Sequence, residues 1–182
     1  ALETAAIMHP EIATDPDARF AFIVSLAITS QNTDVWSNAR YANEVYNEFR
    51  NTGIFPLFGK GKHASSMRDN FDLLNQMINR LDNSGGISAV RELFNSPTTV
   101  RDLKNDGYTP PGGEAMDEEV YGSYLLGPKI GQGFYQNLNG NFDPLTIDMW
   151  LMRTIGRMTG RLVGNPDQLP KQTARLYLSL LG

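Results

Sequence analysis

Hydrophobic residues recur at helical spacing through most of the chain, in segments separated by glycine, proline and asparagine. The segment 19–28 is apolar almost all round, which is typical of a helix in the middle of a bundle. The segments 33–50 and 169–181 instead carry apolar residues on one side, as amphipathic helices do. No alternating strand pattern of useful length is present. The pattern predicts an all-α fold of about eight to ten helices.

Polar residues and prolines indicate where several of these helices begin. Ser65 or Ser66 is expected to cap one helix. Ser96-Pro97 is expected to open another, because proline is favoured in a first turn. The glycine- and proline-rich stretch 107–119 predicts a flexible loop.

A turn at Gly127-Pro128 defines the most distinctive part of the chain. Glycine loses backbone entropy in a helix and proline lacks a hydrogen-bond donor, so the pair predicts a hairpin between two helices. Lys129 follows at the mouth of the second helix, whose apolar positions are Ile130, Phe134 and Leu138. A further helix is expected to open near Asp148.

Composition excludes several classes of protein. The chain of 182 residues has no cysteine, which excludes disulfides, thiol nucleophiles, cysteine-bound zinc and iron–sulfur clusters. Its two histidines, His9 and His63, lie far apart in sequence, so no metal site built from side chains is expected. No run of about eighteen apolar residues is present, so no segment is expected to span a membrane. The first residues lack the features of a signal peptide, which predicts a cytoplasmic protein.

The distribution of charge matters more than its sum. The formal charge of −4 weighs against binding to nucleic acid. From Lys129 onward, however, the chain has six basic and three acidic residues, and much of the acid lies in the loop 114–119. Lys60 and Lys62 alternate with Gly59 and Gly61 in the loop 57–63. They predict either a solvated basic loop or a contact with the DNA backbone.

Two segments together resemble the helix-hairpin-helix DNA glycosylase superfamily, which includes endonuclease III and the archaeal 8-oxoguanine glycosylases. The first is Gln31–Asn38, QNTDVWSN, which is similar to the QxTDVxxN signature of endonuclease III. The second is the hairpin, in which Lys129 and Asp148 have the order and separation of the family's lysine and aspartate.

The match extends further but has departures. Arg153 follows at the spacing of the family's arginine, whereas Trp150 stands where the family has a histidine. Leu125 stands at the position of the first hairpin glycine. The resemblance covers 20–51 and 121–161 and leaves the middle of the chain unmatched.

The resemblance implies a fold and a reaction. The fold is a helical barrel with the hairpin, 18–140, packed against a second helical lobe from both termini, 1–17 and 141–182. Lys129 attacks the sugar carbon that bears the damaged base, and Asp148 stabilises the positive charge left when the base departs. The resulting Schiff base allows β-elimination, so the implied activity is that of a DNA N-glycosylase and AP lyase.

The resemblance also implies a partner, double-stranded DNA bound by a monomer, with the target base flipped out of the stack. DNA contacts are expected from Gln31, Lys60, Lys62, Gly127, Gly131 and Arg153. The candidates to stack on the flipped base are Trp36, Phe134 and Trp150. No cofactor is implied other than a monovalent cation at the hairpin. From the residues alone, structural roles stay open for the same side chains. Gln31 would be a polar residue at a helix break, Arg153 would pair with an acidic residue, and the aromatic residues would lie in the core.

Two other functions fit the same fold. One is a phage-type transferase that joins an amino acid or amine to an activated hydroxymethyl pyrimidine in DNA. The small size, the missing cluster, Leu125 and the unmatched middle favour it. The other is a DNA-binding module without turnover, against which the presence of both Lys129 and Asp148 weighs. The expected compartment is the cytoplasm of a bacterium, an archaeon or a phage-infected host.

Overall fold

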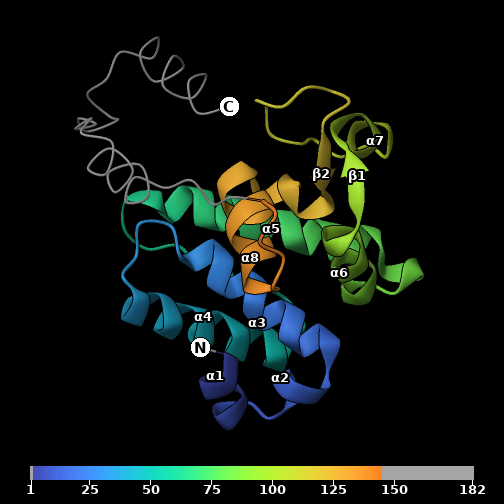
Figure 1. Cartoon of the computed structure of the whole chain (residues 1–182). Coiled ribbons are helices and arrows are strands. Elements are labelled where there is room, and N and C mark those ends of the chain that lie inside the picture. Colours follow the sequence, from blue (N-terminus) through green and yellow to red (C-terminus); the bar gives the residue numbers. More distant parts are fainter. Residues whose placement is uncertain (1, 145–182) are drawn as a thin grey trace, which may run out of the picture. The chain divides into compact units, whose positions relative to one another are not determined.

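The computed structural model describes residues 2–144, which belong to one compact unit of the chain. This part is mostly helical, which confirms the predicted class at that level (Figure 1). Its helical elements are α1 (Leu2–Met8), α2 (Glu11–Thr14), α3 (Pro16–Thr29), α4 (Val35–Thr52), η1 (Gly61–His63), α5 (Ala64–Arg80), η2 (Asp82–Ser84), α6 (Ile87–Asn95), α7 (Val100–Asn105), η3 (Gly122–Leu126), η4 (Pro128–Tyr135) and α8 (Gln136–Leu138). Its strands are β1 (Pro97–Thr99) and β2 (Glu119–Tyr121). No helix among these residues is long and apolar enough to cross a membrane.

Helix α3 is the centre of this unit, as its apolar sequence predicts. Every residue from Phe20 to Thr29 is buried. The helix packs against α2, α4, α5, α6 and η4, and Figure 1 shows it between α4 and α5. Each fully buried leucine, isoleucine or phenylalanine contributes about 1.5–3 kcal/mol, so α3 supplies much of the driving force for folding. The Asp15 side chain caps the helix by accepting from the Asp17 amide at 2.8 Å.

The break after α3 is built by local polar contacts. Asn32 has a φ of 54°, a left-handed conformation that asparagine tolerates better than most residues. Asp34 then caps α4 by accepting from the Trp36 and Ser37 amides at 3.1 and 3.0 Å. A buried hydrogen bond of 2.6 Å from Thr29 to Asn38 joins the two helices across the break. The helix therefore begins at Val35, slightly later than the sequence predicts.

Asp34 makes the start of α4 sensitive to pH. Hydrogen bonds from the Ser37 and Trp36 amides lower the pKa of its carboxyl below the ordinary value of 3.8. Its contribution to stability is therefore complete above about pH 4 and is lost as the pH falls through the lower folded value. We expect the melting temperature of the wild type to fall more steeply below about pH 4 than that of Asp34→Asn, whose amide oxygen can cap without titrating. Thermal unfolding followed by circular dichroism checks this, and parallel profiles would contradict it.

Two short strands are present in residues 2–144, although the sequence shows no strand pattern of useful length and predicts helices alone. β1 and β2 pair in antiparallel register, with Thr98 opposite Val120. Ser96-Pro97 therefore leads into a strand and does not open a helix. Helix α7 begins at Val100 instead, because the Thr99 side chain accepts from the Asp102 amide at 3.1 Å and caps it.

The glycine- and proline-rich segment between α7 and β2 follows a defined course along α7. The Arg101 amide donates to the Met116 carbonyl at 2.8 Å, and the Arg101 guanidinium pairs with Asp117 at 2.8 Å. Further along the chain, the Tyr124 hydroxyl donates to the Pro111 carbonyl at 3.0 Å. The loop predicted to be flexible is thus tied at three points to its neighbours.

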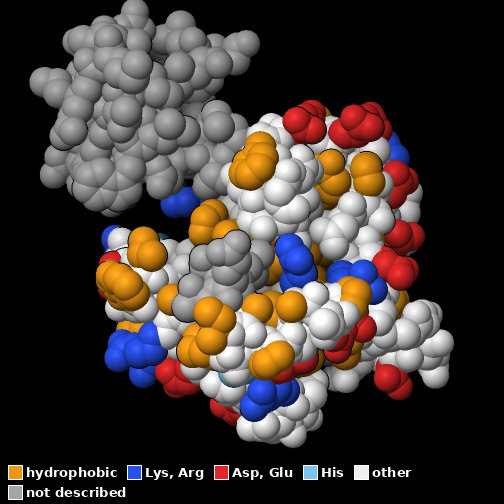
Figure 2. Space-filling view, turned by 60° about the horizontal axis from the view of Figure 1, so that its bottom comes forward, with side chains coloured by type: hydrophobic (Ala, Val, Ile, Leu, Met, Phe, Trp, Pro, Cys, Tyr) orange, Lys and Arg blue, Asp and Glu red, His pale blue; other side chains and the backbone are white. Residues whose placement is uncertain are grey.

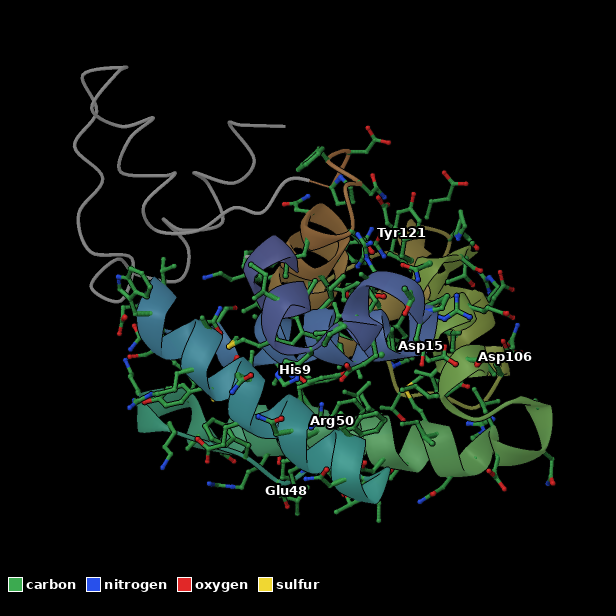
Figure 3. The ribbon with its side chains drawn as sticks, turned by 90° about the horizontal axis from the view of Figure 1, so that it is seen from below. His9, Asp15, Glu48, Arg50, Asp106 and Tyr121 are labelled. Atoms are coloured by element: carbon green, nitrogen blue, oxygen red, sulfur yellow. The ribbon has the colours of Figure 1, made fainter. Side chains whose placement is uncertain are left out.

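The N-terminal helices are attached to α4 by a polar cluster. His9 lies edge-on to Tyr46, with 5.0 Å between ring centroids, and its Nε2 is 2.7 Å from the Asn43 side chain. Glu11 accepts from Tyr46 at 3.0 Å and from Arg50 at 3.1 Å. Figure 3 shows His9 and Arg50 in this region of the molecule. The cluster fixes α1 and α2 to the unit that carries the predicted site residues.

Candidate functional site

The turn predicted at Gly127-Pro128 lies between two short helical segments, η3 and η4. Gly127 has a φ of 103°, which favours glycine, and it ends η3. Its carbonyl accepts from the amides of both Gly131 and Gln132, at 2.9 and 3.3 Å. The bond from Gln132, five residues after Gly127, is that of a π-helical turn, a rare geometry that is often found at functional sites.

Gly131 allows the two arms of the hairpin to cross closely. A Cβ atom at this position would lie 1.7 Å from the Ser123 carbonyl oxygen, a distance that no side chain can occupy. In return, the Ser123 hydroxyl donates to the Gly131 carbonyl at 2.9 Å. Gly131 is buried and serves the packing of the hairpin. The DNA contact expected from it stays a prediction.

A buried polar network anchors the hairpin, and the sequence analysis did not identify its residues. The Gln136 amide donates to the Phe94 carbonyl at 2.8 Å and to the Ser123 hydroxyl at 2.9 Å. The Tyr135 ring lies edge-on to Phe20 of α3 and Phe94 of α6, at 6.1 and 5.7 Å between centroids. In the sequence, the small and amide residues within an otherwise apolar helix were the signal that could have indicated this network. The network fixes the base of η4 against the core.

Lys129 lies in the first turn of η4 with an exposed side chain. Within residues 2–144 it takes part in no ion pair. Its predicted partner Asp148 lies outside the described residues, as do Trp150 and Arg153. The described residues therefore leave the Lys129 amine accessible to a ligand. Its pairing with Asp148 stays a prediction.

Gln31 lies at the break after α3, where its side chain is already engaged. Its amide donates to the Ile28 carbonyl at 3.2 Å, and its amide oxygen accepts from the Ser66 hydroxyl at 2.9 Å.

The prediction that Ser65 or Ser66 caps α5 is therefore wrong. The helix begins at Ala64 without a side-chain cap, because Ser66 lies inside the helix and bonds to Gln31.

The basic loop is held beside α4 by contacts between aromatic rings and cations. The Arg40 guanidinium lies over the Tyr41 ring at 5.1 Å, and Tyr41 packs against Phe58 at 5.2 Å. The Lys60 ammonium lies over the Phe58 ring at 5.9 Å. Lys60 and Lys62 are both exposed. The structure thus brings the predicted lysines to the same region as Gln31, although no hydrogen bond or ion pair joins this region to the hairpin in residues 2–144.

The aromatic candidates within the described residues have different surroundings. Trp36 is 86% exposed on the first turn of α4. Phe134 is partly buried and packs against the hydrophobic core. Of these two candidates, only the Trp36 indole is free to stack on a base without a change in the core.

Neither of two pockets in the described unit is lined by a predicted site residue. One, of about 350 Å³, is next to the hairpin and is lined by Pro97, Glu119, Val120, Tyr121, Gln132, Asp143 and Pro144. The Gln132 side chain, one turn after Lys129, accepts there from the Tyr121 amide at 2.9 Å. The lining includes two carboxylates and no lysine or arginine.

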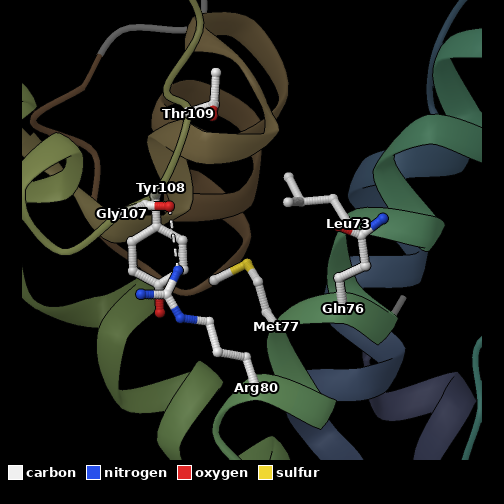
Figure 4. A pocket seen from close by; sticks show the side chains of 7 residues that line it. All are labelled: Leu73, Gln76, Met77, Arg80, Gly107, Tyr108 and Thr109. Atoms are coloured by element: carbon white, nitrogen blue, oxygen red, sulfur yellow. Dashed lines mark hydrogen bonds between the residues drawn. The ribbon is translucent and has the colours of Figure 1, made fainter.

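The other pocket, of about 230 Å³, lies between α5 and the segment after α7 (Figure 4). Arg80 lies over the Tyr108 ring at 4.5 Å and donates to the carbonyls of Asp106 and Gly107. Burial raises the pKa of the Tyr108 hydroxyl. The guanidinium is therefore committed to fixing this segment.

No group of three or more histidine, aspartate or glutamate side chains that could hold a metal ion is present among residues 2–144. The cation expected at the hairpin stays a prediction. Comparison with known proteins found no matching family model, no matching curated protein and no matching solved structure.

Proposed function

We propose that this protein is a DNA base-excision glycosylase with AP lyase activity, and that Lys129 is its nucleophile. One observation carries the proposal: α3 supports both predicted site segments. The hairpin helix η4, with the exposed Lys129, packs against α3, and the break that carries Gln31 follows α3 directly. A buried helix is a rigid support, which is what a reaction between a lysine and a flipped nucleotide needs.

The residues have distinct roles in this reaction. Base departure leaves positive charge on the sugar, which the carboxylate of Asp148 stabilises. An amine attacks only when neutral, whereas a lysine in water carries a proton at neutral pH. The exposed Lys129 therefore loses its proton to a base or becomes desolvated when DNA covers it. Attack on the sugar carbon forms a carbon–nitrogen bond as the bond to the nucleobase breaks and the nucleobase departs with a proton. Cleavage of the ring carbon–oxygen bond, with the remaining amine proton passing to that oxygen, then gives the Schiff base, from which β-elimination expels the 3′-phosphate.

The proposal includes a helical barrel with a helix-hairpin-helix motif and a second lobe formed by both termini. It also includes a cytoplasmic location and a monomer bound to double-stranded DNA. Support comes from the two matching segments in the sequence and from the close crossing of the hairpin at Gly131.

A transferase that joins an amine to an activated pyrimidine in DNA is the second candidate. The pocket next to the hairpin favours it, because Glu119 and Asp143 present two carboxylates without a basic neighbour in the lining. Such a lining suits a protonated amine donor. Here Lys129 does not attack the sugar, and no free base is released.

Borohydride trapping separates the two candidates. The protein is incubated with duplexes that carry uracil, 8-oxoguanine, oxidised thymine or an abasic site, and covalent complexes are resolved on a denaturing gel. A trapped complex with one of these duplexes supports the glycosylase and lyase and identifies the substrate class. DNA binding without a trapped complex on any of them rejects the lyase and favours the transferase.

Release of Gln31 from its tether gives a further prediction. To reach DNA, Gln31 has to give up its bonds to Ser66 and the Ile28 carbonyl. A hydrogen bond of this kind contributes about 1 kcal/mol, so Ser66→Ala is expected to strengthen binding to an abasic duplex by about fivefold. The measurement is fluorescence anisotropy, with Ser65→Ala as the matched control, because Ser65 is an exposed serine on the same helix as Ser66. Equal or weaker binding by Ser66→Ala would argue against a role for Gln31 in the duplex.

A further inference from the structure

The first turn of α4 presents apolar side chains to solvent. Trp36 is 86% exposed and Val35 is 83% exposed, although both are large and hydrophobic. The backbone here is well fixed, because Asp34 caps the helix through the Trp36 and Ser37 amides. An exposed indole on a fixed backbone loses little conformational freedom on binding and contributes a large contact area.

Arg40 and the basic loop contribute positive charge near the start of α4. Arg40 lies one helical turn after Trp36 and therefore on the same face of α4. The stacked pairs Arg40–Tyr41 and Phe58–Lys60 connect this face to the basic loop. The segment 57–68 has three positive residues, Lys60, Lys62 and Arg68, and no acidic residue.

A group of acidic residues lies in another part of the described unit, although Asp34 at the start of α4 and Glu44 two turns after Trp36 are acidic as well. In Figure 2 acidic side chains gather toward the side of the molecule that carries α7, β1 and β2 in Figure 1. This side includes Asp102, Asp106, Asp117, Glu118 and Glu119. The surface around Trp36 therefore combines an exposed indole with the positive charge of Arg40 and the basic loop.

We infer that Trp36, Arg40, Lys60 and Lys62 form a binding surface for single-stranded DNA. An aromatic ring in a basic groove is the usual means of binding unpaired strands, because bases stack on the ring while cations contact the phosphates. An intact duplex hides its base faces in the stack, so a protruding indole gains little there. The occupant is thus an unpaired strand, such as a bubble, a flap or a single strand. The surface does not depend on the chemistry proposed for Lys129.

The test measures binding of the full chain to a 20-nucleotide oligothymidine and to a duplex of equal length, by fluorescence anisotropy at several salt concentrations. The wild type is expected to bind the single strand more tightly than the duplex. Trp36→Ala is expected to lose about tenfold in affinity for the single strand, whereas Trp36→Phe retains most of it. Replacing both Lys60 and Lys62 by glutamine is expected to reduce the slope of log affinity against log salt by about 1.4.

Matched controls separate this surface from general effects. Ile7→Ala removes an equally exposed apolar side chain on α1, and Lys104→Gln removes an exposed lysine on α7. Both are expected to bind like the wild type. Quenching of tryptophan fluorescence by the oligonucleotide is expected to be weaker in Trp36→Phe than in the wild type, because stacking on a base quenches the Trp36 indole directly while Trp150 is present in both proteins.

Three results would overturn the inference: wild-type affinity in Trp36→Ala, equal affinity for duplex and single strand, or no binding to either DNA. The last of these would point to a protein partner for the surface. The outcome is independent of the proposed reaction, because Lys129→Gln is expected to bind the single strand normally. Tight single-strand binding without borohydride trapping would reject the lyase alone.

Discussion

Lys129→Gln is expected to eliminate the borohydride-trapped complex and strand cleavage, with a loss of at least about a thousandfold in the rate of cleavage. The amide of glutamine cannot form the Schiff base that the lyase step requires. Folding should be unaffected, because the side chain is exposed and forms no ion pair among the described residues. The measurement is single-turnover cleavage of the substrate duplex found by trapping, with thermal unfolding of the same sample.

Lys104→Gln is the matched control for this variant. It removes an exposed lysine in the acidic part of the unit, where its ammonium is 3.3 Å from the Met116 sulfur. Full cleavage by Lys104→Gln and none by Lys129→Gln would assign the reaction to the hairpin. If Lys129→Gln cleaves and traps like the wild type, another amine is the nucleophile and the proposed role of Lys129 is wrong.

Gly131→Ala is expected to lower the free energy of unfolding by about 3 kcal/mol, because overpacking at a rigid contact has a cost of this order. The added Cβ would lie 1.7 Å from the Ser123 carbonyl oxygen and 2.6 Å from its carbonyl carbon. These are backbone atoms, so neither can rotate away as the end of a side chain would. In a chain of this length, such a loss lowers the melting temperature by about 10 °C.

Gly112→Ala serves as the control for this substitution. No atom lies within 4 Å of the Cβ that it would add, so we expect its stability to remain close to that of the wild type. Urea unfolding of both variants distinguishes the packing effect from a general loss of glycine. A midpoint for Gly131→Ala that equals that of Gly112→Ala would show that the hairpin arms separate without cost. The close crossing would then carry no weight in the proposed site.

Much of the helical unit was predictable because its signals are local. Eight of the ten buried residues of α3 are apolar, all but Ser25 and Thr29, which favours a helix buried within the fold. Gly127-Pro128 predicts a turn because both residues are poor in a helix interior. The strands β1 and β2 were not predictable in the same way. Each is three residues long, and the partner of Pro97 is Tyr121, more than twenty positions away.

For the candidate site, too, some features were predictable from the sequence and others were not. The sequence indicates Lys129, Gln31 and Trp36 as candidates through the resemblance of two segments to a known family, and their roles stay predictions. It could not indicate that Ser66 bonds to Gln31, since the two residues are 35 positions apart. The contacts of Gly131 with Ser123, and of Gln136 with Phe94, arise only when the helices pack.

By itself, the sequence determined the mostly helical class, the buried position of α3, the hairpin turn and the absence of any chemistry that needs cysteine. These follow from the local preferences of the backbone and from side-chain chemistry. Only the tertiary structure decided that Gly131 is required by a helix crossing, that Gln31 is tethered, and that Trp36 stands exposed among basic residues. Exposure and close approach are properties of packing between distant segments, which no local pattern of residues encodes.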